Sequence, residues 1–128
     1  MAERRLTGLD KTTKRYAILG QSRPANTTAV SIYSPATNVV GFIKCIHICN
    51  QTGTAATCRL FIDNDGTTYD ETTALEFDKS VPANNSLQFF YPDDGLPMND
   101  DAGNLAVRTG TNSALTFTVW GYERLGNG

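Results

Sequence analysis

Short runs of strand-forming residues recur along almost the whole sequence, and each run is bounded by Gly, Asn, Asp or Pro. In the run 73–79, for example, Leu75 and Phe77 alternate with acidic residues. A period of two places successive side chains on opposite faces of a strand. Such runs, separated by turn residues, are typical of an antiparallel sandwich or barrel. We predict about eight strands, over residues 15–19, 27–33, 40–50, 56–63, 73–79, 86–91, 104–108 and 115–122.

Composition supports the same fold class. The 128 residues include 17 Thr, 6 Val and 6 Ile, whose β-branched side chains suit strands better than helices. No stretch shows the i, i+3, i+4, i+7 spacing of an amphipathic helix. We therefore predict an all-β fold, an antiparallel β-sandwich that is either jelly-roll-like or immunoglobulin-like.

The first 14 residues differ from the rest because they lack any strand periodicity. They carry the basic residues Arg4, Arg5, Lys11 and Lys14 together with the apolar residues Leu6 and Leu9. We predict a basic N-terminal arm over residues 1–14, with these six side chains as its partner-binding residues, and one β-sandwich domain over 15–128. Residues 63–101 hold ten acidic residues against one Lys, so an arm and an acidic segment of a neighbouring copy could attract each other. A plain tail and solvated loops explain the same charges.

Net charge and hydropathy exclude two classes of partner. The net charge is −2, which argues against a protein that binds nucleic acid through many phosphate contacts. The most apolar stretch, 39–49, is interrupted by Lys44 and His47 and is shorter than the roughly 20 residues of a membrane-spanning helix. The N-terminus has no apolar signal core. We expect a soluble protein, made in the cytoplasm, with no nucleic acid or membrane partner.

The strand at 40–50 contains a Cys-x-His-x-Cys pattern formed by Cys45, His47 and Cys49. On a strand, alternate residues share a face but rise about 3.3 Å each, so the two cysteines would lie about 13 Å apart. That distance is too large for one tetrahedral ion, and we predict no metal site. If 40–50 and 56–63 form a hairpin, Cys49 faces Cys58, and the two are either a disulfide or two buried thiols.

The same strand is apolar on both faces, which is unusual for an antiparallel sheet with one solvated side. A regular strand would place Phe42, Ile46 and Ile48 on one face, and Ile43 and two cysteines on the other. The second face needs a cover, either a loop of the same chain or a neighbouring subunit. We favour the subunit and predict an oligomer contact at Phe42, Ile46 and Ile48.

Signatures of catalysis are missing from the sequence. Its single His, His47, lies within a predicted strand, and there is neither a nucleophile elbow nor a phosphate-binding glycine loop. The acidic run 63–66 lacks the spacing of an EF-hand and is better explained as a turn, although a weak surface calcium site is a second interpretation. We predict that the chain is not an enzyme and has no catalytic residue and no cofactor. The longest gap between strands, 92–103, is either a partner contact or a wide loop at one end of the sandwich.

Four segments together carry a resemblance to a known family. They are LGQSRPANTTAVSIYSP at 19–35, IHICNQTGTAATCRLFI at 46–62, VPANNSLQF at 81–89 and VWGYERL at 119–125. In this order they resemble small β-sandwich proteins from the structural gene modules of tailed bacteriophages.

The resemblance implies a virion structural protein, in the first place a capsid decoration or cement protein that binds the major capsid protein and forms a homotrimer. A tail, neck or baseplate component is an alternative, as is a carbohydrate-binding adhesin that uses Trp120 and Tyr122. Exposure of Trp120 among polar neighbours would favour sugar binding, and burial beneath another subunit would favour assembly.

Overall fold

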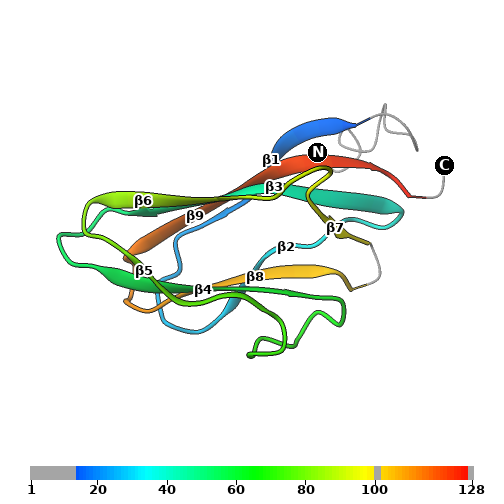
Figure 1. Cartoon of the computed structure of the whole chain (residues 1–128). Helices are drawn as coiled ribbons and strands as arrows, with labels where there is room; N and C mark the ends of the chain where they lie inside the picture. Colours follow the sequence, from blue (N-terminus) through cyan, green and yellow to red (C-terminus); the bar gives the residue numbers. More distant parts are fainter. Residues whose placement is uncertain (1–13, 100–101, 127–128) are drawn as a thin grey trace.

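Two antiparallel sheets pack face to face in the computed structural model, which describes residues 14–99 and 102–126 (Figure 1). The first sheet has the order β1-β9-β3-β6, and β7 pairs with the first part of β3. Its strands are β1 (Arg15–Ser22), β9 (Leu115–Leu125), β3 (Val39–Asn50), β6 (Asn85–Phe90) and β7 (Leu96–Met98). The second sheet has the order β2-β8-β4-β5. Its strands are β2 (Val30–Tyr33), β8 (Asn104–Thr109), β4 (Ala56–Asp63) and β5 (Ala74–Val81). The predicted all-β sandwich is confirmed.

The connections between strands distinguish the two predicted topologies. Apart from β4 and β5, no two of the eight longer strands in the described chain are both consecutive and paired. The chain therefore crosses from one sheet to the other after almost every strand. Immunoglobulin sheets instead pair several consecutive strands. The interleaved order found here is that of a jelly roll.

The core fills the space between the sheets. On β9, Leu115, Phe117 and Val119 point inward and have no exposed surface, while the residues between them face outward. They pack in one cluster with Leu60 of β4 and Val107 of β8. Within the described chain, no helix has the length and apolar character needed to cross a membrane.

A bulge in β3 changes which side chains share a face. The register between β3 and β9 shifts between Ile43 and Cys45, so Lys44 is an extra residue. Ile46 and Ile48 lie fully buried in the core together with Ile43, whereas Phe42 lies on the opposite face. The prediction that Phe42 shares a face with Ile46 and Ile48 is wrong, because a bulge reverses the alternation of side chains. Ile46 and Ile48 are therefore not exposed for the predicted subunit contact.

The segment between β3 and β4 crosses between the sheets and does not form a hairpin. Cys49 pairs in register with Ser86 and Thr116 in the first sheet, whereas Cys58 belongs to the core and pairs with strands of the second sheet. The predicted apposition of Cys49 and Cys58 is wrong for this reason, and both are free thiols. The cross-sheet topology places them in different sheets.

Candidate interaction surface

The face of the first sheet that points away from the core carries an unusual concentration of apolar surface. We call it the outer face. Tyr16, Ile18 and Phe90 are 69%, 62% and 67% exposed, and all three lie on this face. Phe77, on β5 of the other sheet, is the fourth large exposed hydrophobic residue in the described chain. Isolated exposed apolar residues are ordinary, but a contiguous group of them marks an interaction surface.

Strand register brings the apolar side chains of the outer face into one row. Ile18 of β1 is the register partner of Trp120 of β9, which in turn is paired with Cys45 of β3. Cys45 is the partner of Phe90 of β6. Since neighbouring strands lie about 4.8 Å apart, the row crosses the sheet over roughly 14 Å. Cys45 has no exposed surface although it points outward, and Trp120 is half-buried.

An aromatic cluster adjoins this row at the end of the sheet where β1 begins. The ring of Tyr122 is stacked on Phe42, with centroids 4.6 Å apart, and contacts Tyr16 at 5.3 Å. Burial raises the pKa of the Tyr122 phenol. Lys14 closes the cluster, since its Nζ lies 4.8 Å from the centre of the Tyr122 ring and 3.5 Å from a carboxylate oxygen of Asp94.

Polar side chains form the next row of the outer face. A ring nitrogen of His47 is 3.0 Å from the side-chain nitrogen of Gln88. On the other side, the amide of Gln21 donates to the hydroxyl of Thr118 at 3.1 Å. The outer face therefore has an apolar part around Ile18 and Phe90 and a polar part beyond it.

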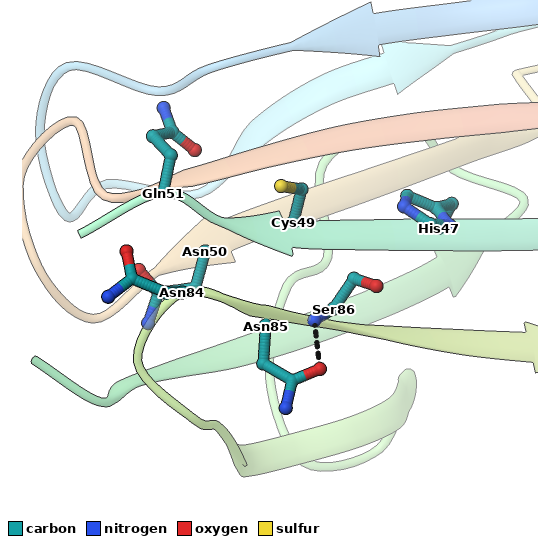
Figure 2. Close-up of a pocket in the computed structure, with 7 residues that line it drawn as sticks. All are labelled: His47, Cys49, Asn50, Gln51, Asn84, Asn85 and Ser86. Carbon is teal, nitrogen blue, oxygen red and sulfur yellow. Dashed lines mark hydrogen bonds between the residues drawn. The ribbon is translucent and has the colours of Figure 1, made fainter. Parts of the chain in front are cut away.

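The polar part ends in an open hollow of about 410 Å³ (Figure 2). Seven residues line it, and none of them is Asp, Glu, Lys or Arg: they are His47, Cys49, Asn50, Gln51, Asn84, Asn85 and Ser86. Figure 2 shows the Cys49 thiol and the His47 ring on the same side of β3. The amide of Asn50 is part of the frame, because it donates to the backbone oxygens of Thr54 and Val81. Asn84, Asn85 and Ser86 line the hollow from the turn before β6 and from the first residues of that strand.

The predicted partner-binding residues have different outcomes. Arg4, Arg5, Leu6, Leu9 and Lys11 lie outside the described residues. Lys14 is described, and its ion pair is with Asp94 of its own chain.

Sequence reasoning missed Tyr16, Ile18 and Phe90 as members of one surface. A signal existed for Phe90, because it stands at a polar position of the alternation in its strand. Nothing in the sequence indicated that β1 and β6 lie in the same sheet, and this pairing pattern is what unites the three side chains.

The acidic run at 63–66 forms a turn held by its own carboxylates. Asp63 accepts backbone N–H groups of Gly66 and Thr68, and Asp65 accepts those of Thr67 and Thr68. The hydrogen bond from the Thr68 hydroxyl is the main cause that lowers the pKa of Asp65. Among the residues the structure describes, no three His, Cys, Asp or Glu side chains are grouped as metal ligands.

No known family model matches the sequence, and no curated protein matches it either. The resemblance to phage structural proteins stays a prediction. The outer face is the feature of the described structure that bears on function.

Proposed function

We propose that this chain is a structural protein of a tailed-bacteriophage virion, a decoration protein that binds the capsid and stabilises the shell. The observation that carries the proposal is the apolar part of the outer face, which presents Ile18, Trp120 and Phe90 on a rigid sheet. Such a surface suits permanent contact with other protein subunits. The sequence resemblance supplies the virion as the setting and the major capsid protein as the partner, and the proposal assigns the chain no catalysis.

Energetics indicate that this surface acts together with other contacts. Fully burying a large apolar side chain contributes about 1.5–3 kcal/mol, so Tyr16, Ile18 and Phe90, each about two-thirds exposed, together contribute roughly 3–6 kcal/mol. Association costs about 4–15 kcal/mol in lost translational and rotational freedom. One apolar face on one partner therefore gives a weak contact. Trimer formation and the basic arm, both predicted from the sequence, would add the contacts that make attachment stable.

The proposal is tested with particles produced from a phage genome that encodes the chain. The chain should cosediment with purified particles, and labelled chains should be visible on them by electron microscopy. Substituting Ile18→Ser together with Phe90→Ser should lower the amount bound by about tenfold or more, which corresponds to a loss of about 1.4 kcal/mol. Phe77→Ser is the matched control, because Phe77 is an exposed aromatic residue on the other sheet. A wild-type chain that is folded and expressed but absent from particles would overturn the proposal.

A carbohydrate-binding adhesin is the second candidate, and the hollow beside His47, which amide and hydroxyl side chains line, favours it. Neutral sugars are bound by amide and hydroxyl groups together with an aromatic ring. The His47 ring lies 6.4 Å from that of Trp120, near enough for one ligand to touch both. Within its own row, however, Trp120 stands between Ile18 and Cys45, and these apolar neighbours favour assembly. Titration with neutral oligosaccharides should change Trp120 fluorescence only if this second function holds.

A further inference from the structure

The apolar part of the outer face lies next to the point where the N-terminal segment joins the sandwich. Thirteen residues precede Lys14, whose side chain is fixed on this face by the Tyr122 ring and Asp94. The first outward residue of β1 is Tyr16, and Ile18 follows on the same face. A segment of known length and composition thus begins at the border of an uncovered apolar surface.

The composition of that segment matches the surface. Leu6 and Leu9 are its large apolar side chains after Met1, and Arg4, Arg5 and Lys11 flank them. Two cations already lie over rings of the outer face, Lys14 over Tyr122 at 4.8 Å and Arg124 over Phe42 at 5.4 Å. Leucines would cover an apolar row, and further cations would lie over exposed aromatic rings, each such contact being favourable.

The reach of the segment is sufficient. At about 3.3 Å per extended residue, 13 residues span roughly 43 Å. Leu9 lies five residues before Lys14 and can be about 17 Å from it, and Leu6 can be about 26 Å from it. The apolar row is only about 14 Å wide. Both leucines can therefore contact one row at once, on whichever copy of the chain that row lies.

The residues next to β1 decide which copy receives the segment. To cover its own face, the segment must reverse direction immediately before Arg15, because β1 runs from Arg15 across that face. Tight reversals use Gly, Pro, Asn or Asp, but 11–14 reads Lys-Thr-Thr-Lys, and the β-branched pair favours extended backbone. The first turn-forming residue on the N-terminal side is Asp10. We expect residues 11–14 to be extended for this reason, and four extended residues would carry the chain about 13 Å from its own sheet before it could turn.

We propose that Leu6 and Leu9 of one copy pack on the outer face of a second copy, against Ile18, Trp120 and Phe90. This inference rests on the proposed assembly function and specifies how the outer face serves it: the face joins one copy to the next, and the assembled oligomer, rather than the single chain, binds the capsid. Because each copy has one segment and one face, mutual exchange gives a closed dimer, and head-to-tail exchange gives a ring such as a trimer.

The first test compares the purified full chain with a chain that lacks residues 2–13. Trp120 is the only tryptophan in the sequence, so its fluorescence reports this face alone. The full chain should sediment as an oligomer at micromolar concentration, and dilution should dissociate it with a red shift of Trp120 emission. The truncated chain should be a monomer with red-shifted emission at every concentration. Circular dichroism should show that both chains keep the sandwich.

A mixing experiment separates the two halves of the contact. The variant Leu6→Ser/Leu9→Ser keeps the face but loses the segment, and Ile18→Ser/Phe90→Ser keeps the segment but loses the face. Each should be monomeric alone, and an equimolar mixture should form a one-to-one complex with a blue shift of Trp120 emission. Phe77→Ser is the control that should assemble like the wild type, because Phe77 lies on β5 of the other sheet.

The result that overturns the inference is equally specific. An oligomer that survives truncation, or a mixture that stays monomeric, would show that the N-terminal segment of a second copy does not cover the outer face. A full chain that is monomeric, but whose Trp120 emission lies to the blue of the truncated chain at every concentration, would mean that the segment covers the face of its own copy. That result also contradicts the proposal. No phage particle enters these measurements, so failure here is distinct from failure of the chain to bind virions.

Discussion

The buried pair Tyr33 and Glu123 links the two sheets through side chains. The Tyr33 hydroxyl donates to Oε2 of Glu123 at 2.6 Å, and both residues are almost completely buried. Gly41 makes room for this contact, since a Cβ at that position would lie 2.2 Å from the Tyr33 oxygen. A buried carboxyl group needs such hydrogen bonds, because water is not available to solvate it.

Replacing Tyr33 by Phe should lower the free energy of unfolding by about 1–3 kcal/mol, because it removes a donor from a buried acceptor. Urea unfolding followed by Trp120 fluorescence measures the change. Tyr16→Phe is the matched control, since the side chain of Tyr16 is mostly exposed, and it should leave the midpoint unchanged. Equal midpoints for all three chains would show that the pair contributes nothing to stability.

The three cysteines should differ in reactivity. Burial raises the pKa of Cys58 to about 12, and burial also raises the pKa of Cys45. Because the thiolate is the nucleophile, a raised pKa slows alkylation. Cys49 is only partly buried and borders the open hollow. Iodoacetamide at neutral pH should therefore modify Cys49 first, and mass spectrometry of peptides should find the other two unmodified until the chain unfolds. Equal labelling of all three in the native protein would contradict this order.

Among the strands, the bulge in β3 shapes the end of the sheet where the aromatic cluster lies. Its extra residue, Lys44, donates from Nζ to the backbone oxygen of Tyr91 at 3.1 Å and also to that of Asp93. These bonds hold the segment that follows β6 against β3. Opposite the bulge stands Gly121, where a Cβ would lie only 1.8 Å from the Phe42 oxygen. The bulge and this glycine therefore depend on each other.

Gly121→Ala should destabilise the fold by about 3 kcal/mol, at the upper end of overpacking effects, because the clash is with backbone. Gly53→Ala is the control, since nothing lies within 4 Å of a Cβ there, and it should change stability by less than about 0.5 kcal/mol. The comparison of the two midpoints in urea checks this. Equal urea midpoints for Gly121→Ala and Gly53→Ala would show that the bulge adjusts to a Cβ at position 121 and does not depend on the glycine.

The alternation of apolar and polar residues was sufficient to predict the bounds of most strands. It failed at the bulge in β3 and at the short strand β7. The predicted run 56–63 coincides with β4, and 40–50 differs from β3 by one residue. The faces of β3 were wrong, because strict alternation assumes a strand without a bulge. The strand β7 lies inside the predicted loop 92–103. It was missed because a strand of three residues centred on Pro97 is too short to show an alternation of apolar and polar residues.

The candidate surface was harder to predict than the strands. It joins residues from β1, β9, β3 and β6, and only the sheet order places them side by side. Run lengths and turns gave eight of the nine described strands, but the β3–β4 connection looked like a hairpin because it has only five residues, among them Gly53 and two Thr. Strand order depends on long-range pairing, which periodicity within a run does not contain.

Considered as a whole, the molecule should lose stability in acid through surface carboxylates that are hydrogen-bonded in the folded state. The Arg59 guanidinium donates to Asp78 at 2.7 Å and holds the pKa of that carboxyl below its ordinary 3.8. Hydrogen bonds from Thr72 likewise lower the pKa of Asp70. A carboxyl group with a depressed folded pKa stabilises the fold above its unfolded pKa, and this contribution is lost as pH falls through the folded value.

The free energy of unfolding should therefore be steady down to about pH 4 and then fall as these carboxyl groups become protonated. Asp78→Asn should flatten the acid branch, because one of the linked protons is removed, and should have little effect on its slope at neutral pH. Denaturant unfolding at a series of pH values measures both. An acid branch identical in the variant and the wild type would show that the Arg59–Asp78 pair does not contribute.

The register of β1 against β9 has a consequence for protein engineering. Arg15 is the direct partner of Glu123, so the start of β1 and the last part of β9 lie side by side at one corner, with the paired Cα atoms about 5 Å apart. A connection made of residues 1–13 and a short linker could join them into a circular permutant that keeps the N-terminal segment, with new ends opened at the exposed turn that contains Gly53. Peptides fused to those new ends would be displayed at the opposite end of the sandwich, away from the corner where the original ends meet. Cargo could thus be carried without obstructing the surface on which assembly is proposed to depend.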